Sequence, residues 1–226
     1  MKIKAVIFDI DNTLVDFLKL KKSCIQPAVA AMVKKGLKVS EEEGVRLVYK
    51  LYEKYGMEYK LIFQELLKEV GQSDYKILAA GILAYRKARV VKPYPGVVDV
   101  LKELRRKGVK LAIVSDAPNL KAYIRLVAMG IEDYFDVIVA YDDTKHHKPA
   151  SLPFEKAVRE LAVKPQEVIM IGDMPDKDVK GAKDMGFISV FALYGNETVD
   201  KGESGADYEI EKVNELLAVI DRIENK

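Results

Sequence analysis

The stretch that most constrains this chain is a short apolar run followed at once by two acids, Lys4-Ala-Val-Ile-Phe-Asp9-Ile-Asp11-Asn-Thr13. The run from Ala5 to Phe8 is rich in β-branched residues, which predicts a strand buried on both faces, as in a parallel sheet. The carboxyl end of such a strand opens into the ligand crevice of an α/β sheet. Asn12 suits a turn because its short amide tolerates unusual backbone angles. Taken alone, the motif fits a capped turn as well as a catalytic site, since Asp and Asn are common at both.

Composition bounds the kinds of protein this can be. A chain of 226 residues, 49% hydrophobic and 32% charged, fits one large domain or a core with a smaller inserted domain. The 37 basic and 35 acidic residues nearly cancel, and the basic run from Lys102 to Lys110 is interpreted as a solvated helix face, so we expect no nucleic-acid partner. Cys24 is the only cysteine, which excludes an internal disulfide and a cysteine zinc cluster. Without a signal peptide or a membrane-length apolar stretch, we expect a cytoplasmic protein with no membrane contact.

The segment from Asp16 to Val91 shows helical spacing only. Its first helix places Leu18 and Met32 on one face, and Pro27 would kink or split it. Ser40-Glu-Glu-Glu43 has the form of a capping box before a second helix. Two further apolar stripes predict a third and a fourth helix, around Leu66 and Ile82.

Strand and helix patterns alternate after the turn residues Pro93-Tyr-Pro95-Gly96. Such alternation predicts a Rossmann-like α/β fold: a parallel sheet with helices on both faces. The first strand then belongs to that sheet, and the helical segment is an insertion that would close over the crevice like a lid. We therefore expect an α/β catalytic core of residues 1–15 and 92–226 and an all-helical cap domain of residues 16–91. The strands are expected at 110–114, 137–140, 168–171, 188–192 and near Tyr208, and the helices at 97–107, 119–129, 153–162, up to Met185, and from about Val213 to Ile223.

Polar residues of matching chemistry follow four of these strands. They could supply a carboxylate nucleophile, an acid and base, a hydroxyl and an ammonium for an anion, and carboxylates for a hard cation. Magnesium prefers one or two carboxylates together with phosphate oxygens. The set suits phosphoryl transfer, in which positioning and charge stabilisation do most of the work. In chain order these residues are Asp9 and Asp11, Ser115, Lys148, and Asp173 with Asp178.

These motifs, in this order, resemble the haloacid dehalogenase-like (HAD) superfamily, in its phosphatase branch with a helical cap inserted after the first motif. The resemblance spans essentially the whole chain. It implies magnesium-dependent hydrolysis of small phosphomonoesters, with a small phosphorylated metabolite as substrate and a monomer or homodimer as the assembly. The motifs that carry it are Asp9-Ile-Asp11-Asn-Thr13, Ser115, Lys148-Pro149, and Gly172-Asp173 with Asp178.

The resemblance also implies a role for each motif residue. Asp9 would attack phosphorus to form an aspartyl-phosphate, and Asp11 would protonate the leaving oxygen and then deprotonate the hydrolytic water. The phosphate-binding set would be Ser115, Asp116 and Lys148, although Asp116 replaces the Asn often found there and should point away from phosphate. The Mg²⁺ set would be Asp9, Asp11 through its backbone carbonyl, Asp173 and Asp178. Within that set, Asp178 is expected behind the direct ligands, supporting the metal or Lys148.

Several alternatives stay open. A 2-haloacid dehalogenase is disfavoured because halide leaves without a proton, whereas an alkoxide needs the acid that Asp11 provides. A sugar-phosphate mutase would use the same acid pair. A phospho-acceptor signalling domain also combines Asp, Ser or Thr, and Lys, but it is about half as long and has a different motif order. A protein that only binds a partner would not need the acid pair and Lys148.

Some neighbouring polar residues have a simpler interpretation. Asp176 is expected to cap a helix rather than bind a ligand. The pair His146 and His147 is expected on an exposed loop. Lys19, Lys21 and Lys22 are expected on solvated surface.

Overall fold

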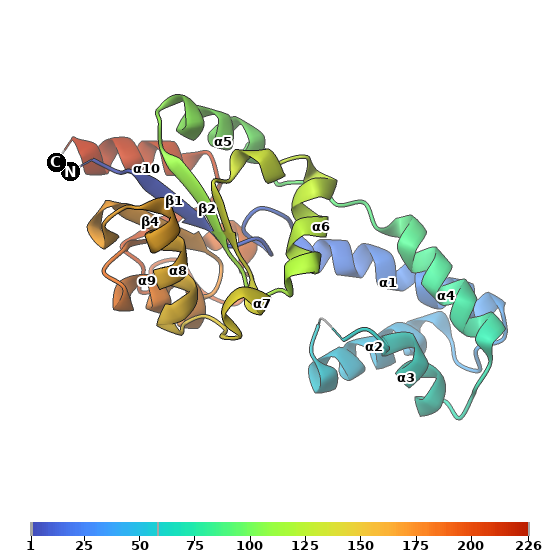
Figure 1. The fold of residues 1–226 in the computed structure, drawn as a ribbon. Helices are drawn as coiled ribbons and strands as arrows, with labels where there is room; N and C mark the ends of the chain where they lie inside the picture. Colours follow the sequence, from blue (N-terminus) through green and yellow to red (C-terminus); the bar gives the residue numbers. More distant parts are fainter. Residues whose placement is uncertain (1, 58, 226) are drawn as a thin grey trace. The chain divides into compact units, whose positions relative to one another are not determined.

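The computed structural model describes residues 2–57 and 59–225. The chain divides into two compact units, which we name the core unit (Met1–Asp16 with Val91–Lys226) and the helical unit (Phe17–Val90). Each is described here by itself (Figure 1). Across the described ranges, no helix is long and apolar enough to cross a membrane.

A six-stranded parallel sheet forms the centre of the core unit. Its order is β3-β2-β1-β4-β5-β6, and every neighbouring pair is parallel. Ala5 at the start of the first strand pairs with Lys110 on one side and Val168 on the other, so that strand is central. This arrangement confirms the predicted α/β class. The strands are β1 (Ala5–Phe8), β2 (Lys110–Val114), β3 (Val137–Val139), β4 (Val168–Gly172), β5 (Ile188–Ala192) and β6 (Tyr208–Ile210).

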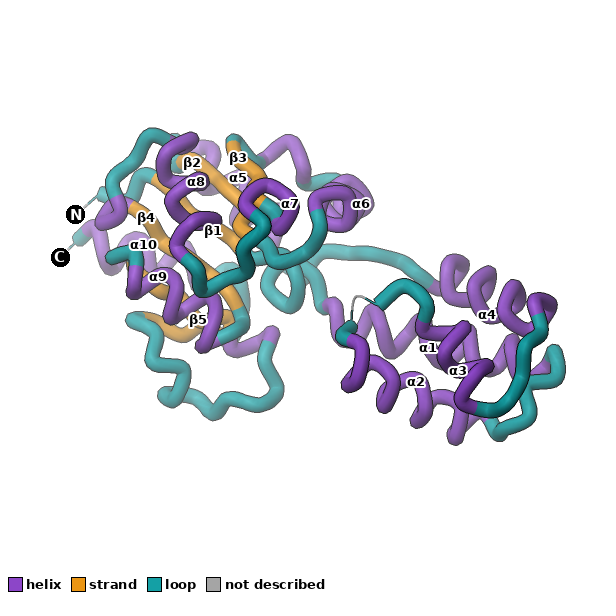
Figure 2. The backbone as a smooth tube through the Cα atoms, turned by 60° about the horizontal axis from the view of Figure 1, so that its bottom comes forward, coloured by secondary structure: helices purple, strands orange, loops and turns teal. Residues whose placement is uncertain are grey.

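Helices cover both faces of the sheet (Figure 2). One face packs against α5 (Val97–Arg106), α6 (Asn119–Met129) and α10 (Glu215–Glu224). The other packs against α8 (Ser151–Leu161) and α9 (Lys180–Asp184). Short helical turns complete the unit: η1 (Glu132–Tyr134), α7 (Tyr141–Thr144), η2 (Pro165–Glu167), η3 (Pro175–Val179) and η4 (Leu193–Gly195).

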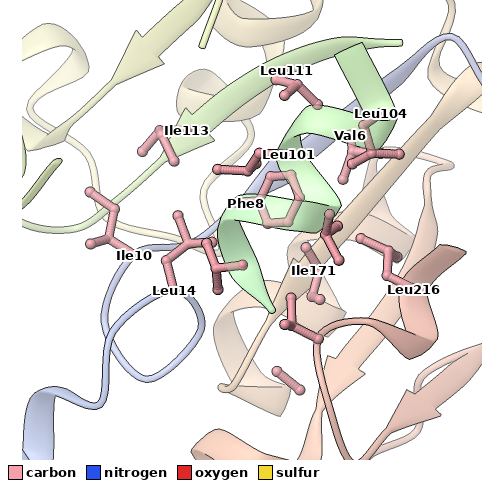
Figure 3. Packing of buried hydrophobic residues seen from close by; sticks show 14 of the residues in the cluster. Val6, Phe8, Ile10, Leu14, Leu101, Leu104, Leu111, Ile113, Ile171 and Leu216 are labelled. Carbon is pink, nitrogen blue, oxygen red and sulfur yellow. The ribbon is translucent and has the colours of Figure 1, made fainter. Parts of the chain in front are cut away.

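The side chains of β1 are buried on both faces of the sheet, as expected for a central strand. Successive side chains of a strand point to opposite faces, so Val6 and Phe8 enter one apolar layer while Ala5 and Ile7 enter the other. All four side chains are fully buried. Figure 3 shows Phe8 surrounded by apolar side chains of the neighbouring strands and of α5 and α10. A strand packed on both faces fixes the point at which the chain leaves the sheet, and that point carries Asp9.

The helical unit contains α1 (Phe17–Lys34), α2 (Glu41–Tyr55), α3 (Ile62–Glu69) and α4 (Tyr75–Ala88). Its interior is built from apolar side chains such as Ile25, Val48 and Leu66. The Ser40 half of the predicted capping box is confirmed, because its hydroxyl accepts the Glu43 backbone N–H at 3.1 Å, whereas the Glu43 carboxylate pairs with Arg46. The apolar stripes that indicated four helices are therefore core positions of this unit.

Two expectations about local structure were wrong, and one alternative for Pro27 is excluded. Pro27 lies inside α1 and does not split it, whereas a kink there stays a prediction. The segment after β4 is not one helix up to Met185; it opens with a π-helical turn, η3, preceded by Met174 at its cap position, so Asp176 is an exposed residue within the turn and not a cap. Lys21 is not on solvated surface.

Burial of Lys21 has a clear physical basis. The side chain is only 9% exposed and its ammonium lies 4.8 Å from the centre of the Tyr52 ring, with Phe17 and Tyr85 also within cation–π range. The ammonium also donates to the Met57 carbonyl at 2.8 Å. Aromatic faces and a carbonyl thus replace water around the charge. Lys19 and Lys22 are exposed, as expected.

Candidate active site

The predicted site residues follow the carboxyl ends of parallel strands, which lie at one edge of the sheet. Asp9 comes directly after β1, and its backbone N–H donates to Ile171 of β4 at 3.0 Å. The chain then turns tightly, with the Ile10 carbonyl accepting from Leu14 at 2.9 Å. Asn12 has a φ of 58°, so the prediction that its amide tolerates an unusual backbone conformation is confirmed. These backbone hydrogen bonds hold Asp9 and Asp11 at the carboxyl end of β1.

Lys148 joins the ends of two strands in one buried ionic cluster. Its ammonium lies 2.6 Å from Asp9 Oδ1 and 2.7 Å from Asp178 Oδ1. All three side chains are less than a tenth exposed. The second Asp178 oxygen accepts the Met174 backbone N–H at 3.0 Å. Asp178 therefore pairs directly with Lys148, while its expected supporting role in the site stays a prediction.

Asp173 is fixed from two directions. Its carboxylate accepts the Asn12 side-chain amide at 3.2 Å, and its backbone carbonyl accepts the Asn196 amide at 2.8 Å. Two glycines make the close packing possible. A Cβ on Gly172 would meet the Asp178 carboxylate at 2.2 Å, and a Cβ on Gly195 would meet the Asn12 carbonyl oxygen at 1.8 Å. Side chains at these two positions would displace the acids from the cluster.

Burial and mutual repulsion raise the pKa values of two of these carboxyl groups. The pKa of Asp9 is well above its ordinary value, because burial and the negative charges of Asp178 and Asp173 outweigh the attraction of Lys148. Burial, and then Asp178, raise the pKa of Asp173 to about 7. Burial disfavours the Lys148 ammonium, but Asp178 and Asp9 outweigh it and raise the pKa of the lysine. The cluster holds more negative charge than one lysine compensates.

The same three acids fit a divalent cation. One carboxylate oxygen from each of Asp9, Asp173 and Asp178 lies within 4.8 Å of the others, and all three residues are buried. Hard cations such as Mg²⁺ take oxygen ligands, and their charge would relieve the repulsion that raises the two pKa values. The residues present therefore fit such an ion. Asp11 is not part of this group of three.

Ser115 and Asp116 follow β2 and differ in orientation. The Ser115 hydroxyl is buried and accepts the Ala117 backbone N–H at 3.2 Å. The Asp116 carboxylate accepts the Lys148 backbone N–H at 2.8 Å and pairs with the Lys177 ammonium at 2.8 Å. Burial opposes its ionisation, yet Lys148 and Lys177 lower the pKa of Asp116 below its ordinary value. Asp116 is thus engaged with the backbone that carries Lys148.

Sequence reasoning missed two basic residues at this edge of the sheet. Lys177 is the partner of Asp116, and no feature of its sequence position distinguishes it from other surface lysines. Arg125 is 1% exposed and its Nε lies 3.0 Å from Asp11 Oδ1. A signal for Arg125 was available, because it occupies the same helix face as the apolar residues Ala122, Leu126 and Met129. His146 and His147 are exposed, as expected.

Comparison with known proteins places this geometry in a family. The model of the haloacid dehalogenase-like hydrolase family matches residues 6–192. The chain is 31% identical to the glyceraldehyde 3-phosphate phosphatase of Methanocaldococcus jannaschii and 34% identical to that of Methanopyrus kandleri, each alignment covering 96% of this chain and 97% of the relative. The crystal structure of a HAD phosphatase from Thermococcus onnurineus superposes with a TM-score of 0.70 at 29% identity, covering 96% of this chain and 98% of that one. The four motifs, the fold and these relatives agree, and the chain belongs to the haloacid dehalogenase-like hydrolases.

Proposed function

We propose that this phosphatase uses Mg²⁺ to hydrolyse small phosphomonoesters through a covalent aspartyl-phosphate on Asp9. The observation that carries the proposal is the buried cluster in which Lys148 bridges Asp9 and Asp178. Residues separated by 139 positions meet there at hydrogen-bond distance. A nucleophilic carboxylate, a fixed cation and a carboxylate site for a metal are the parts that phosphoryl transfer requires.

In the first half of the reaction, an Asp9 carboxylate oxygen attacks phosphorus and the ester P–O bond breaks. Asp11 gives its proton to the departing alkoxide, which leaves as an alcohol. In the second half, Asp11 takes a proton from water as the water oxygen attacks the phosphoryl group. The bond to Asp9 breaks, and inorganic phosphate leaves with both residues restored.

Two groups on the chain would bind the phosphoryl oxygens. Lys148 is held in place by Asp178, and Ser115 offers a hydroxyl after the neighbouring strand β2. Asp116 supports this pair by anchoring the backbone of Lys148 while its own charge is engaged by Lys177. Mg²⁺ bound by Asp9, Asp173 and the Asp11 backbone carbonyl would neutralise charge on the phosphate. Asp178 would not bind the metal directly but would support the site through its contact with Lys148.

The first substrate to test is glyceraldehyde 3-phosphate, because two relatives with more than 30% identity over nearly the whole chain carry that substrate in their names. The helical unit would act as the cap domain and select among substrates. We also propose a cytoplasmic monomer or homodimer.

The experiment is a panel of phosphomonoesters assayed for phosphate release with and without Mg²⁺. The panel contains two short esters, glyceraldehyde 3-phosphate and phosphoglycolate. It also contains a sugar phosphate, glucose 1-phosphate, and a phosphoanhydride, pyrophosphate. We expect Mg²⁺-dependent release from at least one small ester. Release from none of them would contradict the proposal. Conversion of glucose 1-phosphate to its 6-phosphate without free phosphate would identify a mutase instead.

A further inference from the structure

Arg125 is the largest side chain that is fully buried in the described part of the chain. It lies on the inner face of α6, between the apolar residues Ala122, Leu126 and Met129. A guanidinium stays protonated at any physiological pH. Burying such a charge costs several kcal/mol unless an anion and hydrogen bonds compensate it. The chain therefore carries a permanent cation at a position where a leucine would fill the core at lower cost.

The anion beside this cation is Asp11. Arg125 Nε lies 3.0 Å from Asp11 Oδ1, and the side chains of the two residues are 2% and 26% exposed. The Asp11 side chain is thus partly exposed to solvent at one end of the sheet, and its Oδ1 contacts the buried guanidinium of Arg125. This ion pair favours positions of the Asp11 side chain in which Oδ1 stays close to the guanidinium.

A second cation stands one helical turn earlier. Lys121 is half-buried, and burial and then the charge of Arg125 lower its pKa, while the charge of Asp11 opposes that shift. Residues four apart lie on the same side of a helix. Helix α6 therefore carries Arg125 in contact with Asp11, and Lys121 on the same side of the helix, where its charge interacts with that of Asp11.

The opposite side of the site is organised differently. Asp9 and Asp178 contact Lys148 there, and the Asp173 carboxylate lies close to both acids, whereas the Asp11 side chain is not one of the three that converge. Both acids of the first motif thus have their own cation: Lys148 for Asp9 and Arg125 for Asp11. The Asp9 and Asp11 carboxylates, which belong to one short turn, are therefore each held by a different basic residue.

We propose that Arg125 is a positioning residue that fixes the side chain of Asp11 for proton transfer in the phosphatase reaction. The inference rests on the proposed function, and it assigns no contact between Arg125 and substrate. Positioning of a reacting group is worth orders of magnitude in rate, because a poorly placed acid seldom meets the leaving oxygen. The role predicts a defect that depends on how much the leaving group needs a proton.

The test compares Arg125→Met with wild type on two substrates: the alkyl ester that the panel identifies as best, and p-nitrophenyl phosphate, whose leaving group departs without a proton. We expect kcat for the alkyl ester to fall by about tenfold or more, as partial loss of general acid assistance implies, with little change in KM. The loss on p-nitrophenyl phosphate should be much smaller. Arg159→Met, an exposed arginine of α8 changed in the same way, serves as the control and should leave both rates unchanged.

Two further variants separate positioning from general damage. Adding Arg125→Met to Asp11→Ala should cause almost no further loss, because residues that act through one another are not additive. Arg125→Lys keeps the buried charge and should recover part of the alkyl-ester rate. If Arg125→Met fails to fold, as judged by circular dichroism, Arg125→Lys alone and Arg125→Lys added to Asp11→Ala carry the same comparison.

Equal losses on both substrates, additive losses in the double variant, or unchanged rates would each overturn the inference while leaving the phosphatase function intact. Wild-type protein that released phosphate from neither substrate would overturn the proposed function itself, and this inference with it.

Discussion

The Lys148 ammonium lies 2.6 Å from the Asp9 carboxylate, so the residue proposed to anchor phosphate is already paired with the residue proposed to attack it. Burial alone would favour a protonated Asp9, which is a poor nucleophile, and the lysine opposes that tendency. Asp178 also contacts the ammonium, at 2.7 Å, so Lys148 keeps one carboxylate partner if it binds a phosphoryl oxygen as proposed. In the proposed reaction one cation would then serve both the nucleophile and the substrate.

The first prediction concerns the nucleophile. Asp9→Asn is nearly isosteric and should abolish turnover while the far-ultraviolet circular dichroism spectrum stays unchanged, because an amide cannot form the aspartyl-phosphate. Phosphate release from the preferred ester is the measurement. The matched control is Asp200→Asn, an exposed loop acid that should keep wild-type activity. If Asp9→Asn kept more than a small fraction of the rate, another residue would be the nucleophile.

The second prediction is that the protein has no useful dehalogenase activity, although the fold also occurs among dehalogenases. The structure keeps a carboxylate at position 11 and places Arg125 beside it, an arrangement suited to an alkoxide that needs a proton and unnecessary for a halide. Chloride release from a 2-haloacid should be undetectable under conditions where phosphate release is rapid. Comparable rates for the two reactions would refute our interpretation of Asp11.

Much of the core fold could be predicted because its signals are local. The segments Lys110–Val114 and Ile188–Ala192 are mostly apolar, contain β-branched residues and are preceded by glycine turns, and both are strands with the expected bounds. The helix Asn119–Met129 also has the predicted ends, since Gly130 adopts the left-handed conformation that stops it. Parallel strand ends share one edge of a sheet, so the order of polar residues along the chain was enough to suggest a shared site.

The parts that could not be predicted depend on contacts between distant segments. Arg125 was missed because only the folded chain brings α6 against the turn that carries Asp11. Lys21 was assigned to the surface because two of its three aromatic partners, Tyr52 and Tyr85, lie on helices more than thirty positions away. The segment Pro175–Val179 is a π-helical turn instead of an ordinary helix start, and its Asp178 contacts Lys148, a residue 30 positions earlier in the chain. In each case tertiary packing overrides the local pattern.

The third prediction tests the aromatic surroundings of Lys21. Lys21→Met keeps the length of the side chain but removes the cation–π contacts and the hydrogen bond to the Met57 carbonyl. We expect the free energy of unfolding to fall by about 1–3 kcal/mol, the range of a charged hydrogen bond with a partly desolvated cation–π contact. Lys22→Met, on the same helix and exposed, should change it by less than about 0.5 kcal/mol. Equal effects of the two substitutions in denaturant titrations would show that the aromatic contacts contribute nothing.

The last prediction links pH, metal and stability through Asp173. Its pKa rises from 3.8 in the unfolded reference to about 7 in the folded protein, because burial and Asp178 disfavour its charge, and the pKa of Asp9 shifts in the same direction. Between pH 3.8 and about pH 7, the folded state therefore binds more protons at Asp173 than the unfolded state does. Stability from these groups is therefore fully present below the unfolded pKa and is lost as pH rises through the folded pKa. In a chelator, the melting temperature should fall between pH 5 and pH 8.

Mg²⁺ should reverse this loss, because a bound cation replaces the protons that the acids give up. The melting temperature gained on adding Mg²⁺ should accordingly be larger at pH 8 than at pH 5. Asp173→Asn removes the titrating group, so its melting temperature in chelator should depend less on pH and respond less to Mg²⁺, whereas Asp200→Asn should behave as wild type. Orthophosphate should bind wild-type protein weakly in chelator, since the uncompensated acids repel it. A melting temperature that rose with pH in chelator, or phosphate binding that ignored Mg²⁺, would show that the acids of this cluster do not repel one another as their burial implies.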